Sequence, residues 1–235
     1  MKCIMAIAHT TTLQRVLTLL TGLLILKVTA AVVLGYVNYF PPNFDADFLR
    51  GRERYFFGAY QWAFHAHIAS GPVSLLLGVI LISERFRMRY PQRHRLLGRV
   101  QVANVLLLVT PSGLWMAWYT STGIVAGIGF ALLAVLTGTC VALGWRSAVK
   151  RRFQVHRRWM WRCFLLLCSA VVIRLLAGLG TLLGVQSPWF DPLVSWASWL
   201  IPLGTFEVTR LINRRTNSQR TAPALKPSAG YTPRG

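Results

Sequence analysis

The sequence predicts an all-α integral membrane protein, a bundle of six transmembrane helices with both ends on the cytoplasmic side. Three observations carry this prediction. Of the 235 residues, 54% are hydrophobic and only 14% are charged, which is too apolar for a water-soluble domain of this length. The apolar residues form runs of about 20, the length that spans a bilayer. The basic residues fall between these runs, where the positive-inside rule predicts them.

The six expected spans cover residues 13–39, 59–83, 100–119, 124–145, 159–185 and 192–212. Pro41 and Pro42 end the first span, because proline cannot continue a helix. The nearly neutral loop 38–57 suits the outer side, whereas the basic segment 84–99 suits the cytoplasmic side. Only residues 121–123 separate the third span from the fourth, so we expect these two helices to form an antiparallel hairpin.

The remaining connections follow the same rule. Residues 146–158 form a second basic segment on the inner side, and residues 186–191 form a short outer turn. We expect residues 1–212 to form the bundle and residues 213–235, rich in Pro, Ser, Thr and Arg, to be a disordered cytoplasmic tail. The apolar run from Val16 resembles a signal peptide, but it continues to Val37, so we expect it to be retained as a span.

The formal net charge of +20 limits the classes of partner. Nucleic acid would explain such a charge, but the basic residues flank apolar runs instead of forming one patch. We therefore expect the partner to be the bilayer, with anionic lipid at the cytoplasmic face, in the cytoplasmic membrane of a bacterium. The four cysteines lack a CxxC pair, and we interpret the three in or beside spans as small buried hydrophobic residues and expect no metal site.

Histidine is the residue type that can carry chemistry in this chain. His94 and His156 each lie just before the cytoplasmic start of a span, and each has an arginine, Arg99 or Arg162, further along the chain. Two histidines at one depth on neighbouring helices can hold a b-type haem, and the arginines can bind its propionates. The alternatives are another anion, a quinone or a metal at the same place, or ordinary interfacial residues without a ligand.

Two more residues are candidates for cofactor binding, His65 in the second span and Arg174 in the fifth. An arginine inside a span costs about 2.5 to 3.5 kcal/mol on insertion scales, so it is expected to have a partner or a function. Glu207 is the acid within a span, and it can pair with Arg174, with Arg210 or with Lys27. The mid-span prolines can bound a polar cavity for a small anion, and these are Pro72, Pro111 and Pro202.

The strings FHAHIASGPVSLLLG at 64–78, HRLLGR at 94–99 and HRRWMWR at 156–162, with Arg174 downstream, resemble a family of predicted membrane proteins named domain of unknown function 2306. The resemblance covers residues 59–180 and implies a polytopic membrane protein with a shared site. The motif positions that carry over are His65, His94, Arg95, Gly98, Arg99, His156, Arg157, Trp159, Met160, Arg162 and Arg174.

Three hypotheses about function follow. The first is a membrane module that binds a b-type haem or another anionic cofactor at the cytoplasmic His/Arg cluster. The second is a carrier for a small anion that uses the proline-kinked midplane and Arg174. The third is a non-catalytic assembly or lipid-interacting protein. The sequence contains none of the common catalytic motifs, so it does not decide whether the protein is an enzyme.

Overall fold

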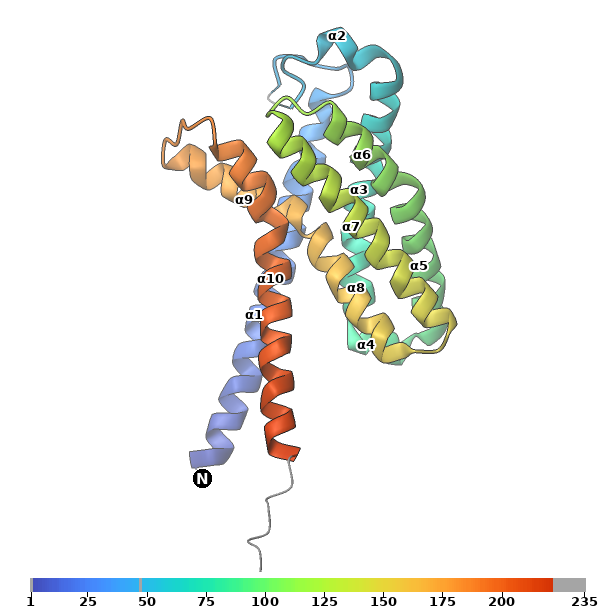
Figure 1. The fold of residues 1–235 in the computed structure, drawn as a ribbon, viewed down its shortest axis with the longest axis vertical. Coiled ribbons are helices and arrows are strands. Elements are labelled where there is room, and N and C mark those ends of the chain that lie inside the picture. The colour runs from blue at the N-terminus through green and yellow to red at the C-terminus, as the bar shows by residue number, and fades with distance from the viewer. Residues whose placement is uncertain (1, 47, 222–235) are drawn as a thin grey trace, which may run out of the picture.

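The computed structural model describes residues 2–46 and 48–221 (Figure 1). This part of the chain is helical and carries no β-strand. Five of its helical segments are long and apolar enough to cross a membrane, and they are Val16–Asn38, Glu53–Ile82, Pro91–Trp118, Ile124–Val149 and Phe153–Leu182. The predicted class of helical membrane protein is confirmed.

The α-helices of the described residues are α1 (Lys2–Leu34), α2 (Glu53–Tyr55), α3 (Gln61–Ile82), α4 (Glu84–Arg89), α5 (Pro91–Asn104), α6 (Thr110–Trp118), α7 (Ile124–Val149), α8 (Phe153–Leu167), α9 (Ser169–Leu182) and α10 (Phe190–Thr221). A short 3-10 helix covers Gly35–Asn38, and π-helical turns cover Phe56–Tyr60 and Val105–Val109.

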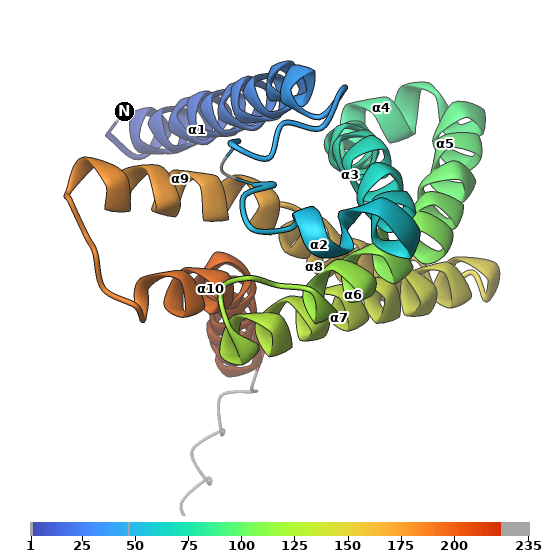
Figure 2. The ribbon, with the colours of Figure 1, turned by 90° about the horizontal axis from the view of Figure 1, so that it is seen from above.

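Two groups of helices make up the bundle. Helices α3 and α5 to α8 pack into one body. Helices α1, α9 and α10 form a second group on one side of this body, as the view from above shows (Figure 2). The start of α1, helix α4, the α7–α8 turn and the end of α10 all lie at one end of the molecule, and the loop with α2 lies at the other (Figure 1). The basic segments therefore gather at the end where α1 begins and α10 ends.

The third segment is longer than the expected span 100–119. Its basic part is helical, because Pro91 occupies the first position of α5, where its missing N–H costs nothing. At the other end, Pro111 follows the π-helical turn Val105–Val109. Proline has no backbone N–H to donate, and the wider turn before it accommodates this loss. His94 and Arg99 consequently lie on the first turns of a membrane helix and not in a loop.

Two details of the C-terminal half add to the expectations. The expected span 159–185 corresponds to the apolar segment Phe153–Leu182, which bends at Cys168 into α8 and α9, and α9 turns away from α8 toward α1 and α10 (Figure 1). Residues 213–221, expected to be disordered, continue α10 because no proline or glycine interrupts the helix there. Residues 222–235, the rest of the expected tail, lie outside the described residues.

The expected sixth span, 192–212, lies within α10, which is not among the five apolar segments. Several hydroxyl groups lower its apolar character, and each bonds a carbonyl of its own helix. Ser195 donates to Pro192 O, Ser198 to Ser195 O and Thr205 to Ile201 O.

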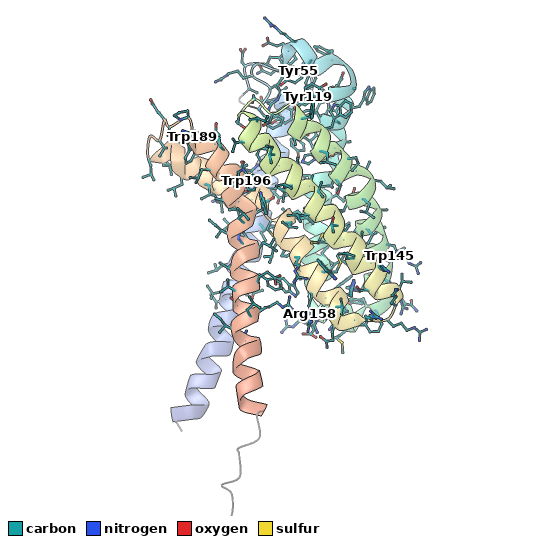
Figure 3. All side chains as sticks on the ribbon, viewed as in Figure 1. Tyr55, Tyr119, Trp145, Arg158, Trp189 and Trp196 are labelled. Carbon is teal, nitrogen blue, oxygen red and sulfur yellow. The ribbon has the colours of Figure 1, made fainter. Side chains whose placement is uncertain are left out.

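An aromatic cap closes the end of the bundle opposite the basic segments. Leu49 and Phe56 from the loop are fully buried against Tyr60 and Phe64 of the second segment. Arg52 is a buried residue of the same loop, and its guanidinium donates hydrogen bonds to Phe48 O and, at 3.3 Å, to Ser121 Oγ. In Figure 3 the labelled Tyr55 and Tyr119 mark this end, and their rings stack with centroids 5.1 Å apart.

Polar side chains of α5 tie it to α3 inside the bundle. The Gln101 amide donates to Ser74 O at 3.0 Å, and the Asn104 amide donates to Ser70 O at 3.1 Å and to Ser74 Oγ at 2.8 Å. Such interhelical hydrogen bonds stabilise membrane helices by about 0.6 to 2 kcal/mol each. They fix the rotation of α5, and with it the direction in which His94 points.

Candidate functional site

Helix α8 presents two different faces at the basic end of the molecule. Because an α-helix repeats every 3.6 residues, His156 and Met160 share one face, whereas Arg158 and Arg162 share another. The first face packs against α7 and the second faces α10. The sequence-predicted His/Arg cluster is therefore divided between two sides of one helix.

His156 is held by the backbone of α7. Its Nδ1 lies 2.9 Å from Gly144 O, and since a carbonyl only accepts, Nδ1 carries the proton. In the neutral imidazole the other ring nitrogen, Nε2, keeps its lone pair, which is the form of a histidine that binds a metal or haem. Gly144 allows this approach, because a Cβ there would lie 2.7 Å from Met160 Sδ.

His94 reaches the same region from α5. Its Nδ1 is buried and has no hydrogen-bond partner among the described residues. The His94 imidazole is close enough to His156 to feel its charge, and it is also within electrostatic range of Arg87. The structure thus places the two predicted histidines within electrostatic range of each other.

Arg162 points the other way and holds Glu207 of α10. Its Nε lies 2.7 Å from Oε1 and its Nη2 lies 3.1 Å from Oε2, a two-pronged ion pair. Arg210 adds a contact of 3.5 Å to Oε2, and the guanidinium of Arg162 lies 4.5 Å from the ring centre of Trp159. Glu207 therefore pairs with Arg162 and Arg210, and the second of these was one of the expected partners.

A pocket of 220 Å³ opens beside this ion pair, between α8 and α10. Three arginines and one acid line it, together with apolar side chains, and the full lining is Val155, Arg158, Trp159, Arg162, Glu207, Arg210 and Leu211. Arg158, labelled in Figure 3, lies where α8 faces α10. The lining carries three positive charges and one negative charge, so the pocket attracts anions.

The chemistry of this pocket suits a group with several acceptor oxygens. Guanidinium groups are planar forks that bind carboxylate or phosphate through two parallel N–H bonds. The indole of Trp159 and the side chains of Val155 and Leu211 give the pocket an apolar wall. Three arginines against one acid make an anion the ligand that the lining favours.

The comparison with family models decides the relationship that the motifs indicated. The model of a family described as predicted membrane protein, DUF2306, matches residues 64–208, which cover both faces of α8 and reach Glu207. The chain belongs to this family. No curated protein and no solved structure matches it.

The remaining candidate residues of this DUF2306 protein lie apart from the pocket. His65 is in the aromatic cap at the far end of α3, stacked on Phe40 with ring centroids 5.1 Å apart. Seventeen residues separate it from Ile82 at the basic end of α3, a rise of about 25 Å. Arg99 is exposed on α5 and forms no ion pair with a described residue. A single site that includes His65, His94 and His156 is therefore not formed.

Arg174 is an exposed cation on α9. Its Nη1 donates to Ala170 O at 2.7 Å, and it interacts electrostatically with Tyr36 and Tyr39, while His67 feels its charge. It has no carboxylate partner among the described residues. The alternative in which Arg174 pairs with Glu207 is not formed, because Glu207 is at the α8–α10 pocket.

The prolines of DUF2306 do not enclose one shared cavity in the described structure. A shallow apolar pocket of 290 Å³ lies at Pro111, and alanines of α3 line it, but neither Pro72 nor Pro202 does. Pro72 leaves Ile68 O without its helical donor, and the hydroxyl of Tyr36 takes this place at 2.8 Å. The polar groups freed by Pro72 are thus used for packing α1 against α3.

Two arginines of the pocket were absent from the predicted site, Arg158 and Arg210. The spacing of these residues along their helices could have indicated them. Arg158 and Arg162 are four residues apart on α8, and Glu207 and Arg210 are three apart on α10, so each pair shares a helix face. The sequence contains no signal for which face of α8 meets α10.

Proposed function

We propose that α10 crosses the membrane as a sixth span and that both termini are cytoplasmic. Two observations support this topology. Helix α10 packs against α7, α8 and α9, and the basic segments 84–99 and 146–158 gather at the end of the molecule where α1 begins and α10 ends (Figure 1). That end carries the positive charge that favours the cytoplasmic side.

Cysteine accessibility tests the topology. In a chain without its native cysteines, Lys150→Cys and Asn213→Cys should react with a membrane-impermeant maleimide only after the membrane is opened. Ser187→Cys should react on intact spheroplasts. If Asn213→Cys and Ser187→Cys are labelled from the same side, α10 does not cross.

We propose that the protein binds an anionic ligand, a phosphate-bearing lipid headgroup, in the pocket between α8 and α10. The observation that carries this proposal is the charge of the lining, three arginines with a single acid around 220 Å³. Phosphate oxygens bind arginine forks in the same geometry in which Glu207 binds Arg162.

The position of the pocket favours a lipid as the source of the phosphate. Basic pockets between membrane helices on the cytoplasmic side bind lipid headgroups. Trp161 stacks with Phe206 beside the pocket, with ring centroids 6.5 Å apart, and aromatic rings of this kind are enriched at the headgroup level. Acyl chains can then follow the exposed apolar surface of α10, where Val208 and Leu211 face outward.

Co-purified lipid tests this proposal. Native mass spectrometry of the protein in mild detergent should show bound anionic phospholipid. The double variant Arg158→Gln, Arg162→Gln should lose about nine-tenths of it, because removing two charged partners costs at least about 1.4 kcal/mol, a factor of ten. Lys150→Gln removes a charge from the same end of the molecule outside the pocket and serves as the control. Equal lipid retention in the double variant and the control would contradict the proposal.

A second candidate function is a module that binds a b-type haem through His94 and His156. Its supporting observations are the hydrogen bond of His156 Nδ1 to Gly144 O, which leaves Nε2 of the neutral ring for a ligand, and the position of His94 within electrostatic range of His156. Haem would supply one-electron chemistry to the module. Protein from haem-replete cells should show a Soret band that either His→Ala variant abolishes, and colourless protein would eliminate this function.

A third candidate is an anion carrier centred on Arg174, supported by its lack of a carboxylate partner among the described residues. Arg174→Gln should abolish chloride or phosphate uptake into proteoliposomes. Lys27→Gln, on the exposed surface of α1, should reduce uptake far less. Absence of flux with the unmodified protein would reject the carrier.

A further inference from the structure

Glu207 occupies the position at which the proposed ligand would bind Arg162. Its two oxygens accept from Nε and Nη2 of Arg162 at 2.7 and 3.1 Å, which uses the two-pronged edge of the guanidinium. A phosphate group that binds the same edge must compete with this carboxylate. The ion pair is therefore a built-in competitor of the ligand as well as a link between α8 and α10.

The surroundings of Glu207 allow such an exchange. The side chains of Arg162 and Arg210 are 22% and 20% exposed, whereas that of Glu207 is 35% exposed, so the carboxylate lies nearest to water. Arg210 is one helical turn from Glu207 on α10 and contacts Oε2 at 3.5 Å. When Arg162 is released, the carboxylate keeps a neighbouring cation on its own helix.

Charge balance indicates which phosphates can make the exchange. The pocket lining carries two more positive than negative charges. A phosphomonoester carries about 1.5 to 2 negative charges at pH 7 and matches this excess, whereas a phosphodiester carries one. A monoester also has three terminal oxygens, enough to bind the arginines of both helices at once.

Resting on the proposed function, we propose that Glu207 is an internal counter-ion that a phosphomonoester headgroup displaces from Arg162, so that the pocket selects phosphomonoesters over phosphodiesters. A singly charged diester only replaces the single charge of the carboxylate, so the arginines gain little attraction. A doubly charged monoester brings a second negative charge, so its attraction to the arginines exceeds that of the carboxylate. Glu207 therefore favours ligands that carry more than one negative charge.

Titration of short-chain lipids into the detergent-solubilised full chain tests this inference. The probes are dioctanoyl phosphatidic acid, dioctanoyl phosphatidylglycerol and inorganic phosphate, and the variants are Glu207→Gln, Glu207→Asp and Arg162→Gln. The unmodified protein should bind phosphatidic acid about tenfold more tightly than phosphatidylglycerol. Glu207→Gln should bind phosphatidylglycerol about tenfold more tightly than the unmodified protein does, and the preference between the two lipids should narrow.

The outcomes separate the two proposals. Phosphatidic acid binding that Glu207→Gln leaves unchanged or weakens would overturn the counter-ion while the pocket stands. If Glu207→Gln does not fold, Glu207→Asp gives the same test, because its shorter side chain weakens the contact to Arg162 and should raise phosphatidylglycerol affinity by a smaller factor. No change in that variant would overturn the counter-ion too. If neither phosphatidic acid nor phosphatidylglycerol binds the unmodified protein, the pocket itself is overturned as a lipid site.

The inorganic phosphate arm identifies the source of the phosphate. If the ligand is a lipid, phosphatidic acid should bind at least tenfold more tightly than inorganic phosphate, because the acyl chains add apolar contact. Equal affinities for inorganic phosphate and phosphatidic acid would overturn the lipid as the ligand. Arg162→Gln should weaken the binding of all three probes.

Discussion

The hydroxyl of Tyr36 donates a 2.8 Å hydrogen bond to Ile68 O, the carbonyl that Pro72 leaves without a helical donor. This bond joins the end of the first membrane segment to the middle of α3. It uses a backbone group that lipid cannot satisfy, and an unpaired carbonyl in hydrocarbon costs several kcal/mol. A proline in one helix thus creates the attachment point for another.

Tyr36→Phe should destabilise the protein by about 1 to 2 kcal/mol, because Ile68 O loses its donor. Pro72→Ala restores a backbone N–H for this carbonyl, so the same tyrosine change should cost little in that background. Urea or heat unfolding of the four proteins in detergent measures the coupling. Equal costs of Tyr36→Phe in both backgrounds would show that the bond does not replace the proline's missing donor.

The amide of Asn104 should be important for the contact between α5 and α3. Asn104→Leu keeps the size of the side chain but removes donors to Ser70 O and Ser74 Oγ, so we expect a loss of about 1 to 2 kcal/mol in unfolding free energy. Thr181→Val is the control, because Thr181 Oγ1 donates only to Ala177 O of its own exposed helix. The prediction is wrong if the two variants unfold alike.

Gly129 provides the space in which Trp196 of α10 meets α7. A Cβ at residue 129 would lie 2.9 Å from Trp196 Nε1, and this nitrogen donates to Val125 O at 3.0 Å. Figure 3 shows Trp196 near the upper part of α10. Gly129→Ala should therefore displace the indole and cost about 1 to 3 kcal/mol. Gly178→Ala, whose Cβ would meet nothing within 4 Å, should be tolerated, and thermal unfolding compares the two.

The aromatic cap depends on a buried arginine. Arg52 is 7% exposed, lies 4.5 Å from the ring centre of Phe48 and bonds Ser121 of the α6–α7 turn. Arg52→Met should free the loop from the helix ends and speed proteolysis within residues 39–57 by about tenfold or more, since charged hydrogen bonds contribute about 1.5 to 3 kcal/mol. Arg54→Met removes an exposed charge from the same loop and should leave the cleavage rate unchanged.

Much of the fold could be predicted from the sequence, because bilayer thickness and the cost of burying charge govern apolar length and the placement of arginine. The placement of His94 and His156 near the starts of helical segments followed from the same rule. The pairing of Glu207 with Arg210, one helical turn apart, was one of three alternatives that the sequence left open. These features depend on distance along one helix, which the sequence gives directly.

The division of α8 into a histidine face and an arginine face could not be predicted as a site. Helical periodicity separates His156 from Arg158 and Arg162, but the rotation of α8 depends on Gly144 and on the position of α10. In the same way, the satisfaction of Ile68 O by Tyr36 requires α1 to cross α3. Such contacts join residues far apart in the chain and leave no local pattern.

The most direct test of the anion pocket is a calorimetric titration of dioctanoyl phosphatidic acid into the purified protein and into the Arg158→Gln, Arg162→Gln variant, with Lys150→Gln as the control. The structure predicts saturable binding at one site per chain in the unmodified protein and the control, and at least a tenfold loss of affinity in the double variant. The same affinity in all three proteins would contradict the assignment of the pocket between α8 and α10.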